Sequence, residues 1–214
     1  MRINKQLSTL TLLMWLAFAC VSSVQAQSPT PSPATVAVQA KVIDDPTVHA
    51  GWRRYQFGER PHFSVIFPVA PQGTTEKPPD AGGATVNTYI SSNQNAFYAA
   101  SRIDGIALNI ENAGDAKREE FFKVYMQGFA RGFEQGMKSR NANFELKLLE
   151  PKRITIAGRP GFQQDFSVLP FNGSGRLVFV GTGAFVVVAI WSPDNPVADR
   201  EAFFKSFQLT GTPK

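Results

Sequence analysis

The stretch RLVFVGTGAFVVVAIWSP, residues Arg176 to Pro193, decides how this sequence folds. It contains two apolar runs, Leu177 to Val180 and Ala184 to Trp191, joined by the short segment Gly181 to Gly183. Because neither run alternates between apolar and polar residues, both faces of each predicted strand must be covered. The stretch therefore predicts a hairpin at the centre of a sheet, with helices on both sides of that sheet.

The bulk composition indicates one domain with a core rich in phenylalanine. The chain has 214 residues, 43% of them hydrophobic, which is sufficient for one ordinary core. Phenylalanine occurs 18 times, against 4 tyrosines and 3 tryptophans. Each buried ring removes on the order of 150–250 Å² from water, so these rings should dominate the core. The formal net charge of +5 is a mild excess spread along the chain, which argues against nucleic acid as the main partner.

An export signal is predicted at the N-terminus. Two basic residues precede the apolar run from Leu10 to Val21, which is too short for a comfortable membrane span. Small or aliphatic residues before the bond between Ala26 and Gln27 fit cleavage there, and we expect a signal peptide over residues 1–26. The mature protein is then periplasmic or secreted, with no integral membrane span.

Cys20 offers a second interpretation of the same segment. Its lipidation would make the protein an outer-membrane lipoprotein, although Phe18 is bulkier than the residues usual before a lipidated cysteine. Cys20 is also the only cysteine of the chain. Cleavage after Ala26 would remove it, which excludes disulfides, thiol catalysis and zinc sites built on cysteine.

A proline-rich flexible linker over residues 27–51 is expected to precede a folded domain over residues 52–214. The linker starts with QSPTPSP, residues Gln27 to Pro33, a composition that favours extended chain. Apolar residues alternate with others over residues 36–42, which leaves a short edge strand and disorder equally open.

Further strands are predicted on both sides of a long helix. The segments that read as strands, besides the central hairpin, are 63–67, 84–91, 96–103, 144–155 and 162–169. Residues 72–83 read as a polar loop. Alternation along residues 96–103 predicts less complete burial there than in the central hairpin.

The long helix is expected to begin at Asp115, a good cap, and to end near the basic residues Lys138 and Arg140. It carries an apolar stripe spaced by four residues: Phe121, Tyr125, Phe129, Phe133 and Met137. A parallel stripe of glycines at positions 128, 132 and 136 would let backbone or a bulky ring approach closely.

A final helix should cover the second face of the sheet. Asp194 or Asn195 is expected to cap it, with Pro196 at its first position and phenylalanines on its buried side. The predicted fold class is therefore α+β: a three-layer α/β/α sandwich around a mainly antiparallel sheet of about six to seven strands. The long helix and the C-terminal helix lie on opposite faces of this sheet.

Four short motifs carry a resemblance to a known family. They are Phe63 to Pro68 (FSVIFP), Gly158 to Gly161 (GRPG) followed by Phe162 and Phe166, Arg176 to Val180 with Phe185 to Val188, and Phe203 to Leu209 (FFKSFQL). In these the chain resembles secreted bacterial proteins with the PsbP-like sandwich fold, which is shared by the photosystem extrinsic protein and a small Ran-binding factor. The resemblance implies no enzymatic activity, since the better-known members of this family bind other proteins and share no catalytic motif.

No constellation of residues in the sequence indicates catalysis, a cofactor or a metal site. The histidines, His49 and His62, are thirteen residues apart and read as surface or strand-edge residues. Asp44, Asp45 and His49 would make an incomplete metal site, because no further ligand follows nearby. The hydrolase motifs GxSxG and HExxH are absent. We therefore assign no catalytic, cofactor-binding or metal-binding residue.

Exposed aromatic residues are the remaining candidates for a site. Trp52 and Tyr55 precede the first predicted strand and Trp191 ends the central hairpin, so they either line a binding groove or complete the edges of the core. The leading hypothesis is an exported, non-enzymatic protein that binds a partner protein of the cell envelope. One alternative is a carrier of small apolar ligands, with its pocket between the long helix and the sheet. Another is an enzyme that uses Asp, Glu, Lys or Tyr alone.

Overall fold

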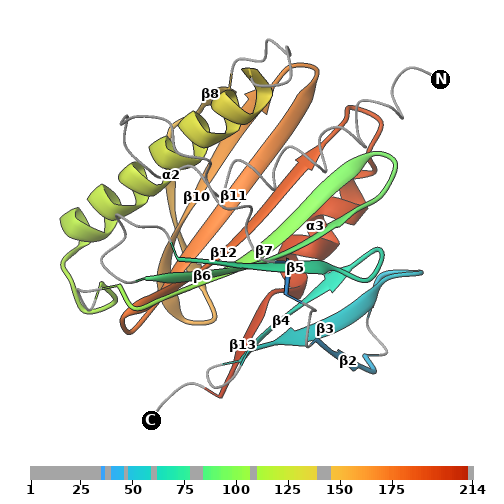
Figure 1. The fold of residues 1–214 in the computed structure, drawn as a ribbon, viewed down its shortest axis with the longest axis horizontal. Helices are drawn as coiled ribbons and strands as arrows, with labels where there is room; N and C mark the ends of the chain where they lie inside the picture. Colours follow the sequence, from blue (N-terminus) through green and yellow to red (C-terminus); the bar gives the residue numbers. More distant parts are fainter. Residues whose placement is uncertain are drawn as a thin grey trace.

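A computed structural model describes residues 35–36, 40–45, 48–58, 62–77, 84–106, 110–138 and 146–211. Cys20, Ala26 and Gln27, on which the signal-peptide and lipidation predictions depend, lie outside the described residues. The described part of the chain contains two helices and two sheets in which the paired strands are antiparallel, which confirms the predicted α+β class (Figure 1).

The larger sheet has nine strands within the described residues, more than the six to seven expected. They are β1 (Thr35–Val36), β5 (Gln72–Glu76), β6 (Thr85–Ser92), β7 (Ala96–Asp104), β8 (Leu146–Leu148), β9 (Lys152–Ile156), β10 (Arg159–Val168), β11 (Phe171–Val180) and β12 (Gly183–Trp191). Their order is β1-β5-β6-β7-β12-β11-β10-β8, and β9 also pairs with β10.

The hairpin of β11 and β12 lies in the middle of this sheet, as predicted. Val180 pairs with Gly183 next to its turn, and the far side of β12 pairs with β7. The side chains from Val186 to Ile190 are at most 3% exposed. β7 is buried just as deeply, because its side chains from Ala96 to Ala100 are 0% exposed. The expectation of weaker burial in this strand was therefore wrong. Small residues on β7 allow dense packing on both faces.

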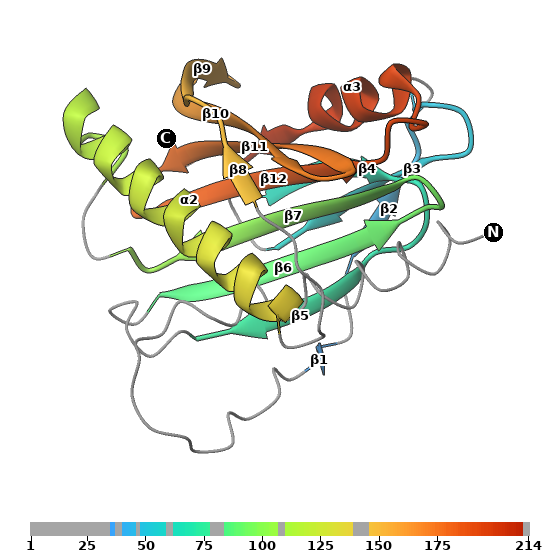
Figure 2. The same ribbon diagram turned by 90° about the horizontal axis from the view of Figure 1, so that it is seen from above.

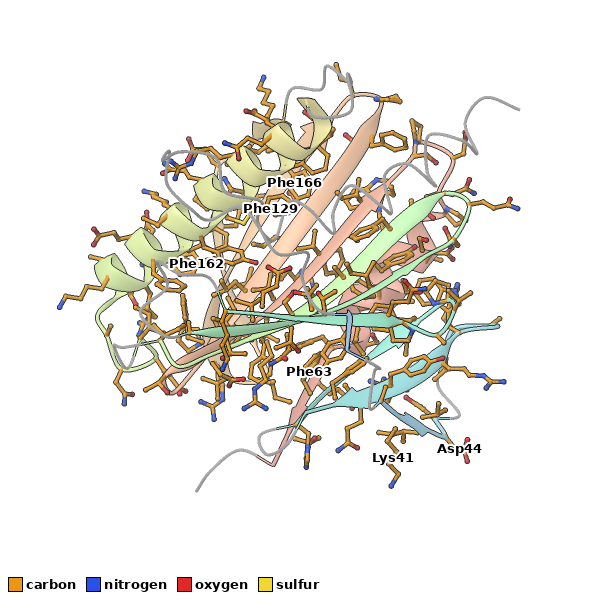
Figure 3. All side chains as sticks on the ribbon, in the orientation of Figure 1. Lys41, Asp44, Phe63, Phe129, Phe162 and Phe166 are labelled. Carbon is orange, nitrogen blue, oxygen red and sulfur yellow. The ribbon has the colours of Figure 1, made fainter. Side chains whose placement is uncertain are left out.

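Helix α2 (Asp115–Lys138) covers one face of the sheet, and its bounds agree with the prediction. Phe122, Met126, Phe129 and Phe133 are at most 5% exposed, while Phe121 and Tyr125 pack at the margin of the same cluster. Figure 3 shows Phe129 with Phe162 and Phe166 of β10 between the helix and the sheet. The Phe129 and Phe166 ring centroids are 5.6 Å apart.

The opposite face is covered by a second sheet together with helix α3 (Val197–Ser206), not by a helix alone. This small sheet has the order β13-β4-β3-β2, formed by β2 (Lys41–Ile43), β3 (Arg53–Phe57), β4 (His62–Phe67) and β13 (Gln208–Thr210). Phe63 of β4 lies between the two sheets, 5.3 Å from the ring of Phe185 (Figure 3). Figure 2 shows α2 and α3 on opposite sides of the larger sheet.

Helix α3 begins one residue later than expected. Pro196 stands at the N-cap and makes no side-chain capping hydrogen bond, so neither Asp194 nor Asn195 caps the helix. The Asn195 side chain is buried and donates a hydrogen bond to the Pro196 carbonyl oxygen instead (3.2 Å). The predicted apolar side is present, because Phe203 and Phe204 are buried.

Two segments form strands that were not predicted from the sequence, because one is polar and the other mixes polar with apolar residues. The segment expected to be a loop over residues 72–83 contains β5, which pairs with β6 and buries Thr74. The segment around Tyr55, expected to precede the first strand of the domain, itself forms β3, which begins directly after Trp52. Pairing to a neighbouring strand satisfies the backbone of these segments whatever their side chains are.

The packed structure also begins before the expected boundary at residue 52. β2 pairs with β3, and Ala40 packs against the core beneath the small sheet. The buried Arg54 side chain forms an ion pair with Asp45 (2.5 Å) and donates a hydrogen bond to the Ser206 carbonyl oxygen (2.6 Å). A charge this deeply buried needs such partners, and they tie residues of the expected linker to the end of α3.

Replacing Gly173 by Ala should destabilise the protein by about 1–3 kcal/mol, because the added methyl group would overlap a ring that cannot move freely. A Cβ on Gly173 would lie 2.1 Å from Cε2 of Phe166, and that ring is held against Phe129. Gly175→Ala is the matched control on the same strand, since its Cβ would make ordinary contacts of 3.7 Å or more. Urea unfolding measures both variants, and equal stabilities would contradict the packing described.

Candidate functional site

The second face of the larger sheet is only partly covered. Val178 and Val180 of β11 lie beneath the small sheet, whereas Arg176 and Ser174, farther along the same face, line an open cleft. The cleft has a volume of about 600 Å³ and is bounded by one side of α3, by β10 and β11, and by the end of β12. It is a concave site next to a helix, of the kind in which ligands commonly bind.

Arg176 is one of the charged residues that line the cleft. Its Nε donates a hydrogen bond to Oε1 of Gln163 (2.9 Å), and its guanidinium carbon lies 4.5 Å from the centroid of the Phe204 ring on α3. Burial lowers the pKa of Arg176, and the charge of Asp165 opposes this effect. An arginine keeps its charge in proteins, so a half-buried cation faces the cleft.

A second arginine is held in a similar way. The guanidinium carbon of Arg200 lies 4.8 Å from the centroid of the Trp191 ring, within the range of a cation–π interaction. Five residues along α3, Lys205 is engaged differently, because it forms an ion pair with Glu201 (2.9 Å). Both arginines are therefore oriented by aromatic rings, and Arg176 is also held through its Nε by Gln163.

Asp165 is the acidic residue on the floor of the cleft. It accepts a hydrogen bond from the Gln163 amide (3.1 Å) and pairs with Lys152 (3.4 Å). Burial alone would raise the pKa of Asp165, but the facing Ser174 hydroxyl, the Gln163 amide and the Lys152 charge together hold it below its usual value. The carboxylate is thus ionised and already occupied by its neighbours.

The two arginines have no carboxylate partner within 4 Å in the part of the chain that the structure describes. Arg176 and Arg200 both line the cleft, where their charges would stabilise anionic groups. Asp165 and Glu201, the acidic residues of the cleft, are paired with lysines. The arrangement can bind a ligand.

The three aromatic residues predicted to line a groove do not form one. Trp191 lines the cleft, whereas Trp52 packs edge-on against Tyr98 with 5.0 Å between ring centroids. Tyr55 is 6% exposed and contacts Phe67. Trp52 and Tyr55 therefore complete the core, which is the simpler of the two interpretations of the sequence.

The two histidines have separate partners. His49 interacts with Asp199 of α3 (Nε2 to Oδ1, 2.8 Å), and Nδ1 of His62 lies 2.7 Å from the carbonyl oxygen of Gly58. Lys41 and Asp44 lie at the exposed edge of the small sheet (Figure 3). Among the described residues, no three His, Cys, Asp or Glu side chains are grouped to hold a metal, and no helix is long and apolar enough to cross a membrane.

Sequence reasoning found Trp191 but missed both arginines of the cleft. Arg176 was visible as the one charge at the start of the apolar run that opens the hairpin, and a charge beside such a run is seldom fully buried. Arg200 carries no local signal, because its aromatic partner lies on another element. Only the docking of α3 beside β12 brings Arg200 and Trp191 together.

Comparison with known proteins concerns the fold. No family model and no curated protein matches the sequence. The structure is similar to the solution structure of cyanobacterial PsbP (CyanoP) from Synechocystis sp. PCC 6803, with a TM-score of 0.48 and 10% sequence identity over 78% of this chain and 97% of that chain. No conclusion about family or function follows from a similarity at this level.

Replacing Asp165 by Asn should lower the free energy of unfolding more at about pH 6 than at about pH 3. Its folded-state pKa lies below the usual 3.8, so the carboxylate stabilises the fold above that value and loses this effect as the pH falls through the folded-state pKa. Urea unfolding at the two pH values measures the difference.

Glu76→Gln is the control, because its effect on the free energy of unfolding should change with pH in the opposite direction. Burial raises the pKa of Glu76 above 4.5, so its ionised form disfavours the fold and its removal should be more favourable at the higher pH. An Asp165→Asn effect that is the same at both pH values would contradict the description of the cleft floor.

Proposed function

We propose that this chain is an exported, non-enzymatic binding protein of the cell envelope that holds a partner protein in the cleft beside α3. The proposal combines the export signal expected from the sequence with the open cleft. One observation carries it: two arginines, stacked on Phe204 and Trp191, face a cleft of about 600 Å³ without carboxylate partners in the described residues.

The geometry of the cleft supports binding in preference to chemistry. Stacking restricts the guanidinium groups of Arg176 and Arg200, so a ligand would order them at a lower entropic cost. Glu76, with its raised pKa, lies on β5, and Asp165, with its lowered pKa, lies on β10. Four strands separate β5 from β10 in the sheet, so these two carboxyl groups do not form an acid–base pair.

The alternative of an apolar-ligand carrier gains no support from the packing of α2. Phe122, Met126, Phe129 and Phe133 fill the space that such a pocket would need, and Phe122 stacks on Phe162 with 5.0 Å between ring centroids. Two cavities along α2, which also reach Arg153 of β9 and Leu148 of β8, are lined mainly by charged and polar residues. The cleft beside α3 is therefore the better-supported site.

Blocking the cleft should abolish capture of the partner. Asn172 is an exposed residue of the cleft on β11, and Asn172→Trp would fill part of the space next to Trp191. We expect the exported chain to capture a protein from envelope extracts of the source organism, and Asn172→Trp to reduce that capture at least several-fold. Quantitative mass spectrometry of the eluates measures it.

Gln127→Trp is the matched control, since Gln127 is exposed on α2, on the other side of the sheet. It should capture the partner as the natural chain does. Capture that is at background level, or that both substitutions reduce equally, would contradict the proposal.

Export is tested by the mass of the mature protein. Cleavage between Ala26 and Gln27 predicts a chain that starts at Gln27 and is found in the soluble periplasmic or extracellular fraction. Lipidation would instead leave Cys20 as the first residue, with the added mass of the lipid and recovery in the membrane fraction. Intact-protein mass spectrometry separates the two, and a retained Met1 in the cytoplasmic fraction would overturn both.

A further inference from the structure

We propose that the cleft recognises an acidic, extended segment of the partner protein, whose carboxylates pair with Arg176 and Arg200 while its apolar side chains contact the walls. This inference rests on the proposed function and names the chemistry of the partner. The unpaired charges of the cleft, its apolar surfaces and its size support this inference.

The charges of the cleft separate into paired and unpaired groups. Glu201 forms an ion pair with Lys205 (2.9 Å), and Asp165 forms one with Lys152 (3.4 Å). Arg176 uses its Nε for Gln163, and in the described part of the chain no hydrogen bond engages its terminal nitrogens or any nitrogen of Arg200. Carboxylates are the groups that such guanidinium edges bind best, often through two parallel hydrogen bonds.

The surroundings of Arg176 strengthen this preference. Burial disfavours its charged form, which lowers its pKa, and an arriving carboxylate would offset that cost. Gln163 holds Arg176 through one nitrogen and in turn donates to Asp165, so the guanidinium is fixed by a short hydrogen-bonded chain. A fixed cation gains more from a ligand than a mobile surface lysine does.

The apolar walls favour a peptide over a small anion. Phe204 and Trp191 present ring surface beside the arginines, and Leu149 on the facing side is 49% exposed. A volume of about 600 Å³ is far more than a single phosphate or carboxylate needs and suits several residues of an extended chain. Alternate side chains of such a chain could meet the arginines and the apolar walls in turn.

The acidic residues of the cleft argue against a phosphate or a lipid headgroup. Asp165 and Glu201 remain negative near the ligand, and their repulsion grows with the charge of the ligand. A carboxylate carries one charge, whereas a phosphate monoester carries nearly two. The mixed lining therefore selects singly charged groups on a partly apolar chain.

The test uses a short peptide in which glutamate alternates with leucine, and the same peptide with every glutamate replaced by glutamine. Calorimetry with the purified exported chain should show the glutamate peptide binding at least about tenfold more tightly, with an affinity that falls as salt rises. In NMR spectra, the Nε–H signal of Arg176 and the indole N–H of Trp191 should shift on binding.

Single substitutions assign the effect to the arginines. Arg176→Gln and Arg200→Gln should each weaken binding roughly tenfold, since each removes a charged hydrogen-bonding group. Lys205→Gln should change it by less than about threefold, because Lys205 is exposed and already paired with Glu201. Arg131→Gln, on the exposed side of α2, removes the same kind of charge away from the cleft and should have no effect.

The outcomes separate this inference from the proposed function. Equal binding of the two peptides, or unchanged binding by the Arg200→Gln variant, would overturn the acidic-segment inference even if the chain captures a partner. Arg200 lies on the surface of α3, so this variant remains informative if Arg176→Gln fails to fold. Inorganic phosphate or anionic phospholipid vesicles that displace the peptide at equal concentration would also overturn it. If the chain binds the glutamate peptide but captures no protein from envelope extracts, the proposed function is refuted and the preference for an acidic segment is not.

Discussion

Val187 and Val188 are neighbours on β12 that point to opposite faces of the larger sheet, and both are almost completely buried. A strand that is apolar on both faces stays folded only if each face is kept from water, so the sheet needs two separate covers. Helix α2 supplies one through its phenylalanines, and the small sheet with α3 supplies the other. The need to cover this second face positions the N-terminal and C-terminal segments of the domain.

The two covers differ in extent, and the cleft follows from that difference. On the α2 face, Phe162, Phe166 and Leu177 continue the apolar core across β10 and β11. On the other face the same strands carry Gln163 and Arg176, and the small sheet ends before it reaches them. The alternation along β10 is that of a half-solvated strand. The cleft is thus the uncovered remainder of a face, with α3 as its wall.

The long helix and the central hairpin were predictable because their patterns are local. A stripe spaced by four residues marks α2, and an unbroken apolar run marks β12. The small sheet was not predictable in the same way. β13 comes from the C-terminal end and pairs with β4, while β2 comes from the segment expected to be a linker. Strands of three residues carry too little pattern to be recognised, and β5 has the polar composition of a loop.

The sequence by itself determined that the central hairpin must be buried on both faces and that the long helix covers one of those faces. These features depend on periodicity and side-chain chemistry, which are properties of contiguous residues. Only the tertiary structure decided that a second sheet shares the other face with α3, and that Arg176 meets Phe204 while Arg200 meets Trp191. Contacts between side chains on different elements depend on how those elements dock, and no local pattern specifies that.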